Sequence, residues 1–353
     1  MPLSISSSNA NERLPTGNWL LTWVITLVLT LSTIFGWEWY CRTIGFTPNG
    51  VADTDDLWVQ ARKRASSVGH EGVILVGASR IQLGVNTDVM SRYTQTRPVQ
   101  LALDGSQFMP ILENLAADDS ITGTVIVDME IEKISRPNTD ERTTKLLDYY
   151  RYRQQEAPYG AIQPLENWLT THLNSLFAFR LTGANPQMLL SQQLAGVNLA
   201  GDYLITLPDR SRQADYTKVS QPDFYLTRLQ RNLGNETLDN IKPSQWPAFE
   251  ADVHVVEGLV QRIEKRGGRV IFVRFPTDKG IWQIDEGRLP RVQYWDKLAA
   301  LTSAETIHFK DYPELSRFDQ ADGSHLDYRD AIPFTEALSR IIFKQPTPAV
   351  GSS

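Results

Sequence analysis

The stretch Val73-Ile74-Leu75-Val76-Gly77-Ala78-Ser79-Arg80 organises the whole chain. Its four apolar residues, most of them β-branched, predict a buried strand, and the Gly-Ala-Ser-Arg that follows ends this strand abruptly. Open α/β sheets carry their chemistry in the loops beyond the carboxyl ends of their strands. We therefore expect Ser79 to lie at the functional edge of a sheet.

Strand patterns alternate with helix patterns on both sides of this stretch. Further strands are predicted at residues 99–103, 124–127, 269–273 and 306–309. Helices are predicted at residues 54–67, 109–117, 251–266, 291–300 and 331–343. Such alternation is typical of an α/β fold with a parallel sheet.

Residues 131–248 interrupt the alternation. They are rich in Gln, Asn, Tyr, Leu and Arg, include amphipathic segments such as residues 166–180, and have no strong strand pattern. We expect a mainly helical insertion that caps the carboxyl edge of the sheet, and an irregular surface excursion without a role is the alternative. The α/β domain would then comprise residues 45–130 and 249–344, followed by a disordered tail at 345–353.

Composition excludes several function classes. A net charge of −6 and a pI near 5.5 give no reason to expect nucleic acid as a partner. The single cysteine, Cys41, excludes an intrachain disulfide and a cysteine-based metal cluster. The histidines His70, His172, His254 and His308 show no metal-ligand spacing, so we predict no metal site and no cofactor.

The amino-terminal region carries a long apolar segment. No charged residue lies between Leu14 and Trp37, and about 19 residues at 1.5 Å each make a helix of roughly 28 Å, close to the thickness of a bilayer core. Trp19 and Trp23 at one end and Trp39 near the other resemble interfacial aromatic belts. We predict a tail at 1–18 and a transmembrane anchor at 19–40, with a cleaved signal peptide or a buried core helix as alternatives.

A second stretch, Asp322-Gly-Ser-His325, precedes the last predicted helix. A serine hydroxyl becomes a good nucleophile when an imidazole accepts its proton, and the imidazole needs a carboxylate to fix its tautomer. We assign Ser79 as nucleophile, His325 as base and Asp322 as the carboxylate. Asp319 and Asp327 are nearby alternatives to Asp322.

Three of these features together resemble the SGNH/GDSL hydrolase superfamily. Gly77-Ala78-Ser79-Arg80 matches its block I, Gly105 its block II and Asp322-x-x-His325 its block V, over residues 70–130 and 250–343. The resemblance implies a three-layer α/β/α, flavodoxin-like fold with a small parallel sheet. It also implies a Ser79 acyl-enzyme whose oxyanion is bound by the backbone N–H groups of Ser79 and Gly105.

Two positions depart from the family pattern. Ala78 precedes the serine where the family name expects aspartate, and the block III asparagine is absent. The third strand instead continues into Asp128-Met-Glu130-Ile-Glu132. The missing asparagine would have been a third oxyanion donor. Its absence argues against efficient hydrolysis more than against acyl transfer.

The anchor makes the chain similar to membrane-tethered members that handle acyl groups on surface polymers. A single amino-terminal span ahead of a folded domain most often acts as a signal anchor, so we predict a single-pass protein of the cytoplasmic membrane with a periplasmic body. The resemblance implies that this body is a serine esterase or O-acyltransferase acting on acyl, foremost acetyl, esters of an envelope polysaccharide. A membrane-bound acyltransferase is the implied partner. A non-catalytic assembly or glycan-binding subunit, and a lipid or small-ester hydrolase, remain alternatives.

Two arginines are expected at the carboxyl edge of the sheet. Arg80 follows the nucleophile, and Arg274 follows the strand at 269–273. They are predicted either to hold the loops through salt bridges or to bind a sugar or an anionic substrate.

Overall fold

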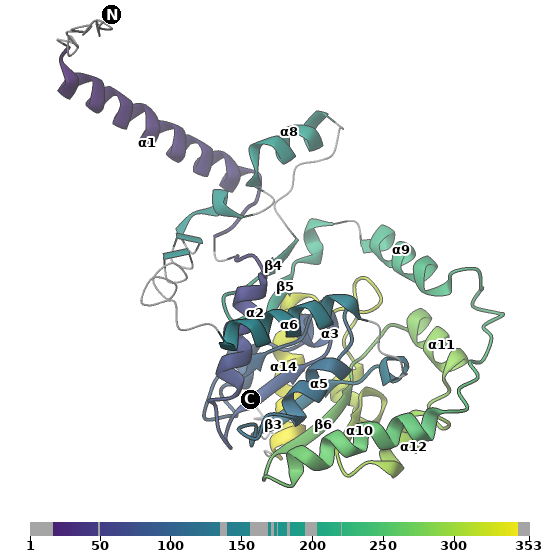
Figure 1. The fold of residues 1–353 in the computed structure, drawn as a ribbon. Coiled ribbons are helices and arrows are strands. Elements are labelled where there is room, and N and C mark those ends of the chain that lie inside the picture. The colour runs from purple at the N-terminus through teal and green to yellow at the C-terminus, as the bar shows by residue number, and fades with distance from the viewer. Residues whose placement is uncertain are drawn as a thin grey trace, which may run out of the picture.

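The structure is a computed structural model that describes residues 17–48, 50–134, 140–155, 169–170, 173–174, 176–181, 184–194, 203–219 and 221–344. At its centre is a five-stranded parallel sheet in the order β2-β1-β3-β6-β7, which confirms the α/β prediction (Figure 1). The strands are β1 (Val73–Val76), β2 (Val99–Gln100), β3 (Thr124–Asp128), β6 (Arg269–Arg274) and β7 (Glu305–His308).

The strands read as unbroken apolar runs because both faces of the sheet are covered. All four residues of β1 are buried, and Ile74 pairs with Val99 of β2 and Val125 of β3. β2 is shorter than predicted, yet the chain stays extended beyond it. The N–H of Leu101 donates to Leu75 (2.8 Å) and that of Leu103 to Gly77 (3.1 Å).

Helices form a layer on each face of the sheet. One layer contains α2 (Asp55–Ala65), α5 (Met109–Ala116), α10 (Phe249–Glu264) and α12 (Trp295–Leu301). The other contains α3 (Ser79–Gly84), α4 (Thr87–Met90), α13 (Pro313–Ser316) and α14 (Tyr328–Phe343). Two further elements, α11 (Lys279–Arg288) and η5 (Phe309–Asp311), flank the carboxyl ends of β6 and β7.

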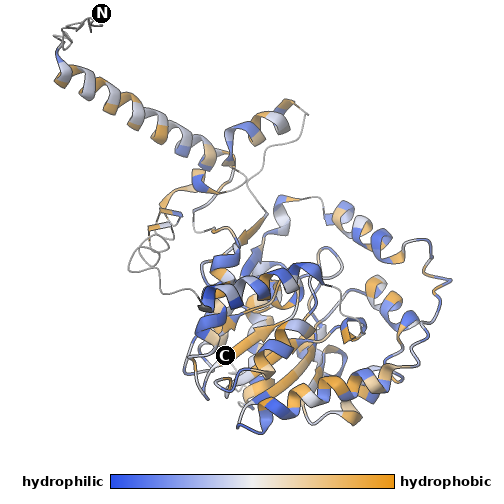
Figure 2. Ribbon diagram, in the orientation of Figure 1, coloured by the Kyte–Doolittle hydropathy of each residue, from blue (hydrophilic) through white to orange (hydrophobic). Residues whose placement is uncertain are grey.

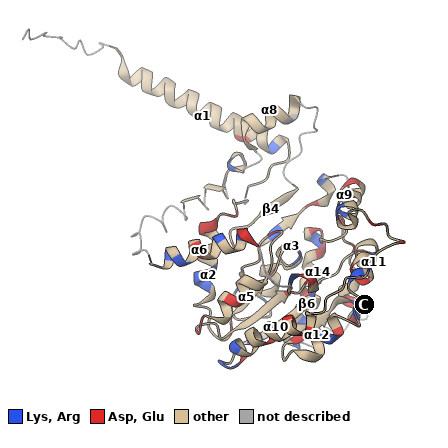
Figure 3. Ribbon diagram, turned by 45° about the vertical axis from the view of Figure 1, so that its right-hand side comes forward, with Lys and Arg blue, Asp and Glu red and all other residues tan. Residues whose placement is uncertain are grey.

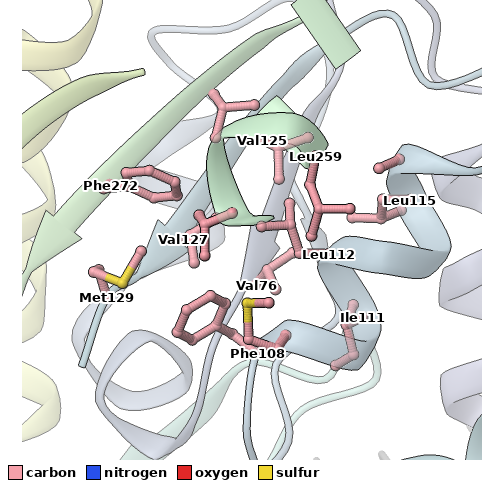
Figure 4. Close-up of a cluster of buried hydrophobic side chains, with 14 of the residues drawn as sticks. Val76, Phe108, Ile111, Leu112, Leu115, Val125, Val127, Met129, Leu259 and Phe272 are labelled. Carbon is pink, nitrogen blue, oxygen red and sulfur yellow. The ribbon is translucent and has the colours of Figure 1, made fainter. Parts of the chain in front are cut away.

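The first core lies between the sheet and α5 and α10. Val76, Val127 and Phe272 project from the strands toward Leu112 and Leu259 of the helices (Figure 4). Truncating such a fully buried leucine to alanine typically costs about 2–5 kcal/mol of stability. Apolar residues accordingly concentrate in the strands and on the inward faces of the helices (Figure 2).

The last helix differs from its prediction at the amino-terminal end. Asp327 caps α14 by accepting the N–H of Arg329 (3.0 Å), so the helix begins at Tyr328, before the predicted start at residue 331. Pro333, which the predicted bounds 331–343 would place in the first turn, therefore lies inside the helix.

The described part of residues 131–248 contains both helices and a hairpin. The hairpin pairs three-residue strands, β4 (Leu204–Thr206) and β5 (Arg212–Ala214), which are too short for a period-2 pattern to reveal. Of the predicted helix at 166–180, the structure describes residues 169–170, 173–174 and 176–180. The helical elements are η1 (Ile131–Ile134), α6 (Glu141–Gln155), η2 (Ala178–Arg180), α8 (Pro186–Leu194), η4 (Tyr216–Lys218) and α9 (Gln221–Leu233).

The predicted apolar segment forms α1 (Trp19–Thr43), which projects from the body (Figure 1). Among the described residues it is the one helix long and apolar enough to cross a membrane. Most of its residues are exposed, whereas Glu38 and Cys41 near its carboxyl end are buried. The tail predicted at 345–353 and residues 1–16 of the amino-terminal tail lie outside the described residues.

Candidate active site

Ser79 is positioned by a tight strand-to-helix turn. β1 ends at Val76, and Ser79 is the first residue of α3. Between them Gly77 has a φ of +145°, and a Cβ there would lie 2.5 Å from the Cβ of Asp128. Only glycine fits this position. The strand order reverses between β1 and β3, and such switch points are where open α/β sheets bind ligands.

His325 joins Ser79 to Asp322 in one hydrogen-bonded row. Its Nε2 lies 2.7 Å from the Ser79 Oγ, and its Nδ1 lies 2.8 Å from the Asp322 Oδ2. Asp327, one of the alternative carboxylates, caps α14 and accepts the N–H of Tyr216 (3.0 Å). The structure thus brings together the three residues of the predicted triad, with Asp322 as the carboxylate that contacts the imidazole.

The Asp-x-x-His spacing has a local reason. The Asp322 Oδ1 accepts the backbone N–H groups of Ser324 (3.0 Å) and His325 (2.9 Å), which leaves Oδ2 for the imidazole. One carboxylate therefore shapes the loop and orients the ring. Gly323, with a φ of +86°, completes the turn.

The charges of the triad are set for base catalysis. Burial acts to raise the pKa of Asp322, but the hydrogen bond from His325 and the charge of Arg228 outweigh it and hold this pKa well below its usual range. Burial lowers the pKa of His325, Asp322 opposes that effect, and Arg228 reinforces it. The imidazole is therefore neutral at pH 7 and can accept the serine proton.

The two predicted oxyanion donors follow adjacent strands, Ser79 after β1 and Gly105 after β2. Ser79 opens α3, and the first N–H groups of a helix have no intrahelical acceptor. Gly105 follows the extended segment that bonds to Gly77 and adopts a φ of +69°. Beside it the carboxylate of Asp104 pairs with Arg212 (2.8 Å), which offsets a negative charge close to the site.

Carboxylates occupy the end of β3, where the family pattern expects an amide. Asp128 is 1% exposed, and burial followed by the charge of Glu130 raises its pKa to about 7. No hydrogen bond of ordinary geometry reaches either of its oxygens from the described residues, although the N–H of Ala78 is close enough to oppose the rise in pKa. The protonated form of Asp128 is thus populated near neutral pH.

Arg80 and Arg274 both reach the carboxyl edge, and both are engaged by carboxylates. Arg80 contacts Glu130 (3.0 Å) and the Ser324 Oγ (2.9 Å), so it connects the end of β3 to the Asp322–His325 loop. Arg274 pairs with Asp285 and lines a cavity of about 170 Å³. Both arginines hold loops together, and a substrate contact for either stays a prediction.

Two residues of the 131–248 region complete the surroundings of the triad, and sequence reasoning missed both. Arg228 of α9 lies 2.9 Å from the Asp322 Oδ2 and 3.3 Å from the His325 Nδ1. The hydroxyl of the buried Tyr216 also hydrogen-bonds Asp322. No motif or spacing links either residue to the Asp-x-x-His stretch, so nothing in the sequence could have indicated them.

Within the described residues, no group of three His, Cys, Asp or Glu side chains could hold a metal ion. His308 is a core residue: it contacts the rings of Trp282, Trp295 and Phe309, and burial lowers its pKa to about 3. No protein-family model matches the sequence, and no curated protein matches it. The function is therefore inferred from the site itself.

Proposed function

We propose that this protein is a serine esterase or O-acyltransferase that works through an acyl ester on Ser79. The observation that carries the proposal is the continuous Ser79–His325–Asp322 row, with links of 2.7 and 2.8 Å. A chance serine at the amino end of a helix would not meet a neutral imidazole that is itself bonded to an ionised carboxylate. These are the roles that nucleophilic acyl transfer requires.

The proposed reaction has two halves. His325 Nε2 takes the hydroxyl proton as the Ser79 Oγ attacks the ester carbonyl, and the resulting oxyanion is stabilised by the N–H groups of Ser79 and Gly105. The intermediate collapses, the alcohol leaves with the proton from His325, and Ser79 remains acylated. Water or a sugar hydroxyl then gives its proton to His325 and attacks the acyl group, and the Ser79 Oγ leaves with that proton from His325. Asp322 stabilises the imidazolium in both halves.

The proposed substrate is an acylated, foremost acetylated, envelope polysaccharide. Support comes from the apolar helix α1 and from the sequence resemblance to membrane-tethered SGNH proteins, whose flavodoxin-like fold we propose for the sheet domain. In this proposal the chain has a single span in the cytoplasmic membrane and the catalytic domain lies on the periplasmic side. A membrane-bound acyltransferase would supply the acyl group to a transferase.

A second candidate is a non-catalytic, membrane-tethered subunit that binds a glycan or assists assembly. The observation in its favour is the end of β3, where the carboxylates of Asp128 and Glu130 replace an amide donor. A carboxylate near a developing oxyanion raises the barrier unless it is protonated or paired. Hydrolysis of a lipid or small ester is a third candidate, favoured by the apolar helix next to the domain.

The experiment uses the full-length protein in detergent, because the end of α1 is packed against the body. A serine-reactive fluorophosphonate with intact-mass detection, and turnover of p-nitrophenyl acetate, are measured for wild type, Ser79→Ala and Ser91→Ala. Ser91 is the matched control, since its hydroxyl bonds a local carbonyl in α4. We expect adduct and turnover in wild type and Ser91→Ala, and a loss of about a thousandfold or more in Ser79→Ala.

Two results would count against the proposal. A folded wild-type protein that forms no adduct and turns over no ester would favour the non-catalytic subunit. Labelling that persists in Ser79→Ala would assign the nucleophile to another residue. If turnover is found, adding acetylated and free glycan acceptors separates transfer from hydrolysis, because only transfer yields a newly acylated sugar.

A further inference from the structure

The carboxyl-terminal end of α1 is built into the body by a buried carboxylate. Glu38 accepts the backbone N–H groups of Ala178 (3.1 Å) and Phe179 (3.0 Å) of η2 and is paired with Arg42. Arg42 in turn donates to the carbonyl of Leu176 (3.0 Å). A buried charge with these partners is held firmly, because moving it away would leave it unpaired.

Apolar packing joins the same elements. Cys41 of α1 is fully buried together with Ala184 and with Leu189 of α8, and Trp37 and Tyr40 pack against this cluster. We refer to η2, α8 and the last turns of α1, from Trp37 to Thr43, as the collar. Cleavage of α1 as a signal peptide would remove the helix that covers Ala184 and Leu189 and would expose these side chains. The packing therefore favours a retained anchor.

α8 exposes several apolar side chains. Leu190 (57% exposed) and Leu194 (80% exposed) lie one turn apart on the same side of the helix, together with Gln187 and Ser191, and Met188 is exposed on another side. No charged residue occurs between Arg180 and Asp202 in the sequence. Exposed apolar side chains of this kind mark a site that contacts another protein, a ligand or a membrane.

The location of α8 favours the membrane among these three partners. The apolar span of α1 ends near Trp37, and Trp37, Trp39 and Tyr40 form the aromatic group that belongs at the membrane surface. Trp37 and Tyr40 pack against the cluster that contains Leu189, so α8 lies at the same level. α8 flanks the end of α1, away from the sheet, while charged residues gather on the body (Figure 3).

We propose that the collar is a lipid-contacting surface, with α8 lying in the headgroup region of the bilayer that α1 spans. Leu190 and Leu194 face the acyl chains, and Arg42 and Arg180 lie at its charged margin. The inference rests on membrane anchoring by α1, which is part of the proposed function. A body attached to the bilayer through α1 and α8 has a restricted orientation, unlike a domain on a flexible tether.

The test places a fluorophore at single cysteines in the full-length protein. Leu190→Cys reports on α8, Leu27→Cys on the exposed apolar side of α1, and Val292→Cys on a loop of the body that is 75% exposed. Each variant is labelled with an environment-sensitive fluorophore and reconstituted into vesicles of phosphatidylcholine and phosphatidylglycerol, with and without doxyl-labelled lipid as quencher. Unsubstituted protein gives the background from Cys41, which is buried.

We expect doxyl lipid to quench the label at position 190 several-fold more than the label at position 292. A label at 190 that is quenched no more than the one at 292, while position 27 is quenched, would overturn the collar proposal. So would a label at 190 whose emission is blue-shifted in vesicles but insensitive to doxyl lipid, because protein would then cover α8. An unquenched label at position 27 would instead refute the membrane anchor itself.

Discussion

Replacing Arg228 by methionine should move the acidic limb of the pH–rate profile to higher pH. The guanidinium lies 3.3 Å from the His325 Nδ1 and 2.9 Å from the Asp322 Oδ2, so it both repels a protonated imidazole and shares the carboxylate that stabilises it. Methionine keeps the length of the side chain but removes the charge. Both consequences of the change raise the pKa of His325.

The magnitude follows from Coulomb's law. Two unit charges at 3.3 Å interact by about 1.3 kcal/mol in a water-like dielectric and by about 5 kcal/mol at an effective value near 20. The effect should lie between these figures, because the Arg228 side chain is 23% exposed and its charge is delocalised. Since one pKa unit corresponds to about 1.4 kcal/mol, the limb should rise by at least about one unit.

The assay is kcat/KM for p-nitrophenyl acetate between pH 4 and 9, whose acidic limb reports the base of the free enzyme. Arg228→Lys is the matched control, because it keeps the charge and should leave the limb within a few tenths of a unit. The plateau rate should change much less than in Ser79→Ala, since the Ser79–His325 hydrogen bond does not involve Arg228.

Two outcomes would refute this reasoning. A limb that stays in place in Arg228→Met, with normal unfolding behaviour, would show that the arginine is screened from the imidazole. A limb that moves to lower pH would show that Arg228 raises the pKa of His325. Its effect on Asp322 would then outweigh its repulsion of the protonated imidazole. Absence of activity in wild type is a separate result, because it contradicts the triad and not the role of Arg228.

Two further predictions concern the turn that holds Ser79. Burial and Glu130 raise the pKa of Asp128 to about 7, so the folded chain keeps a proton that the unfolded chain loses above about pH 4, and stability falls as pH rises from about 4 to 7. Asp128→Asn should therefore raise the melting temperature more at pH 8 than at pH 5, and an equal or reversed difference would contradict this pKa. Gly77→Ala should cost about 2–4 kcal/mol in urea unfolding, because its Cβ meets Asp128 at 2.5 Å at a positive φ. Gly258→Ala, in open space on α10, should instead stabilise by about 0.5–1 kcal/mol, and equal effects of the two changes would disprove the steric argument.

Features encoded in short stretches were predictable from the sequence. Val73–Val76 forms a strand because four consecutive apolar residues suit a sheet covered on both faces. Thr54, where the predicted helix at 54–67 begins, caps α2 by accepting the N–H of Leu57. The positive φ of Gly267 likewise follows the predicted end of α10. At the two helix ends the deciding interaction joins residues within a few positions of one another, and the strand is indicated by four consecutive apolar residues.

The boundaries were less predictable. α14 begins earlier than expected because Asp327 takes the cap, and β2 ends after two residues although its chain stays extended beside β1. The hairpin of β4 and β5 has three-residue strands, whose hydrogen bonds to each other outweigh a weak local pattern. The end of β2 depends on the partners that its backbone groups find on β1, whereas the cap of α14 and the hairpin are local contacts that the sequence pattern marks only weakly.

The sequence by itself determined the residue types available at the site, the parallel α/β pattern and the long apolar helix. Only the tertiary structure decided that Ser79 and His325, 246 residues apart, meet at 2.7 Å. It also brought Arg228 to Asp322 and Glu38 to η2. The physical reason is that periodicity and turn chemistry act over a few residues, whereas charge pairing and burial depend on distances that exist only once the chain has folded.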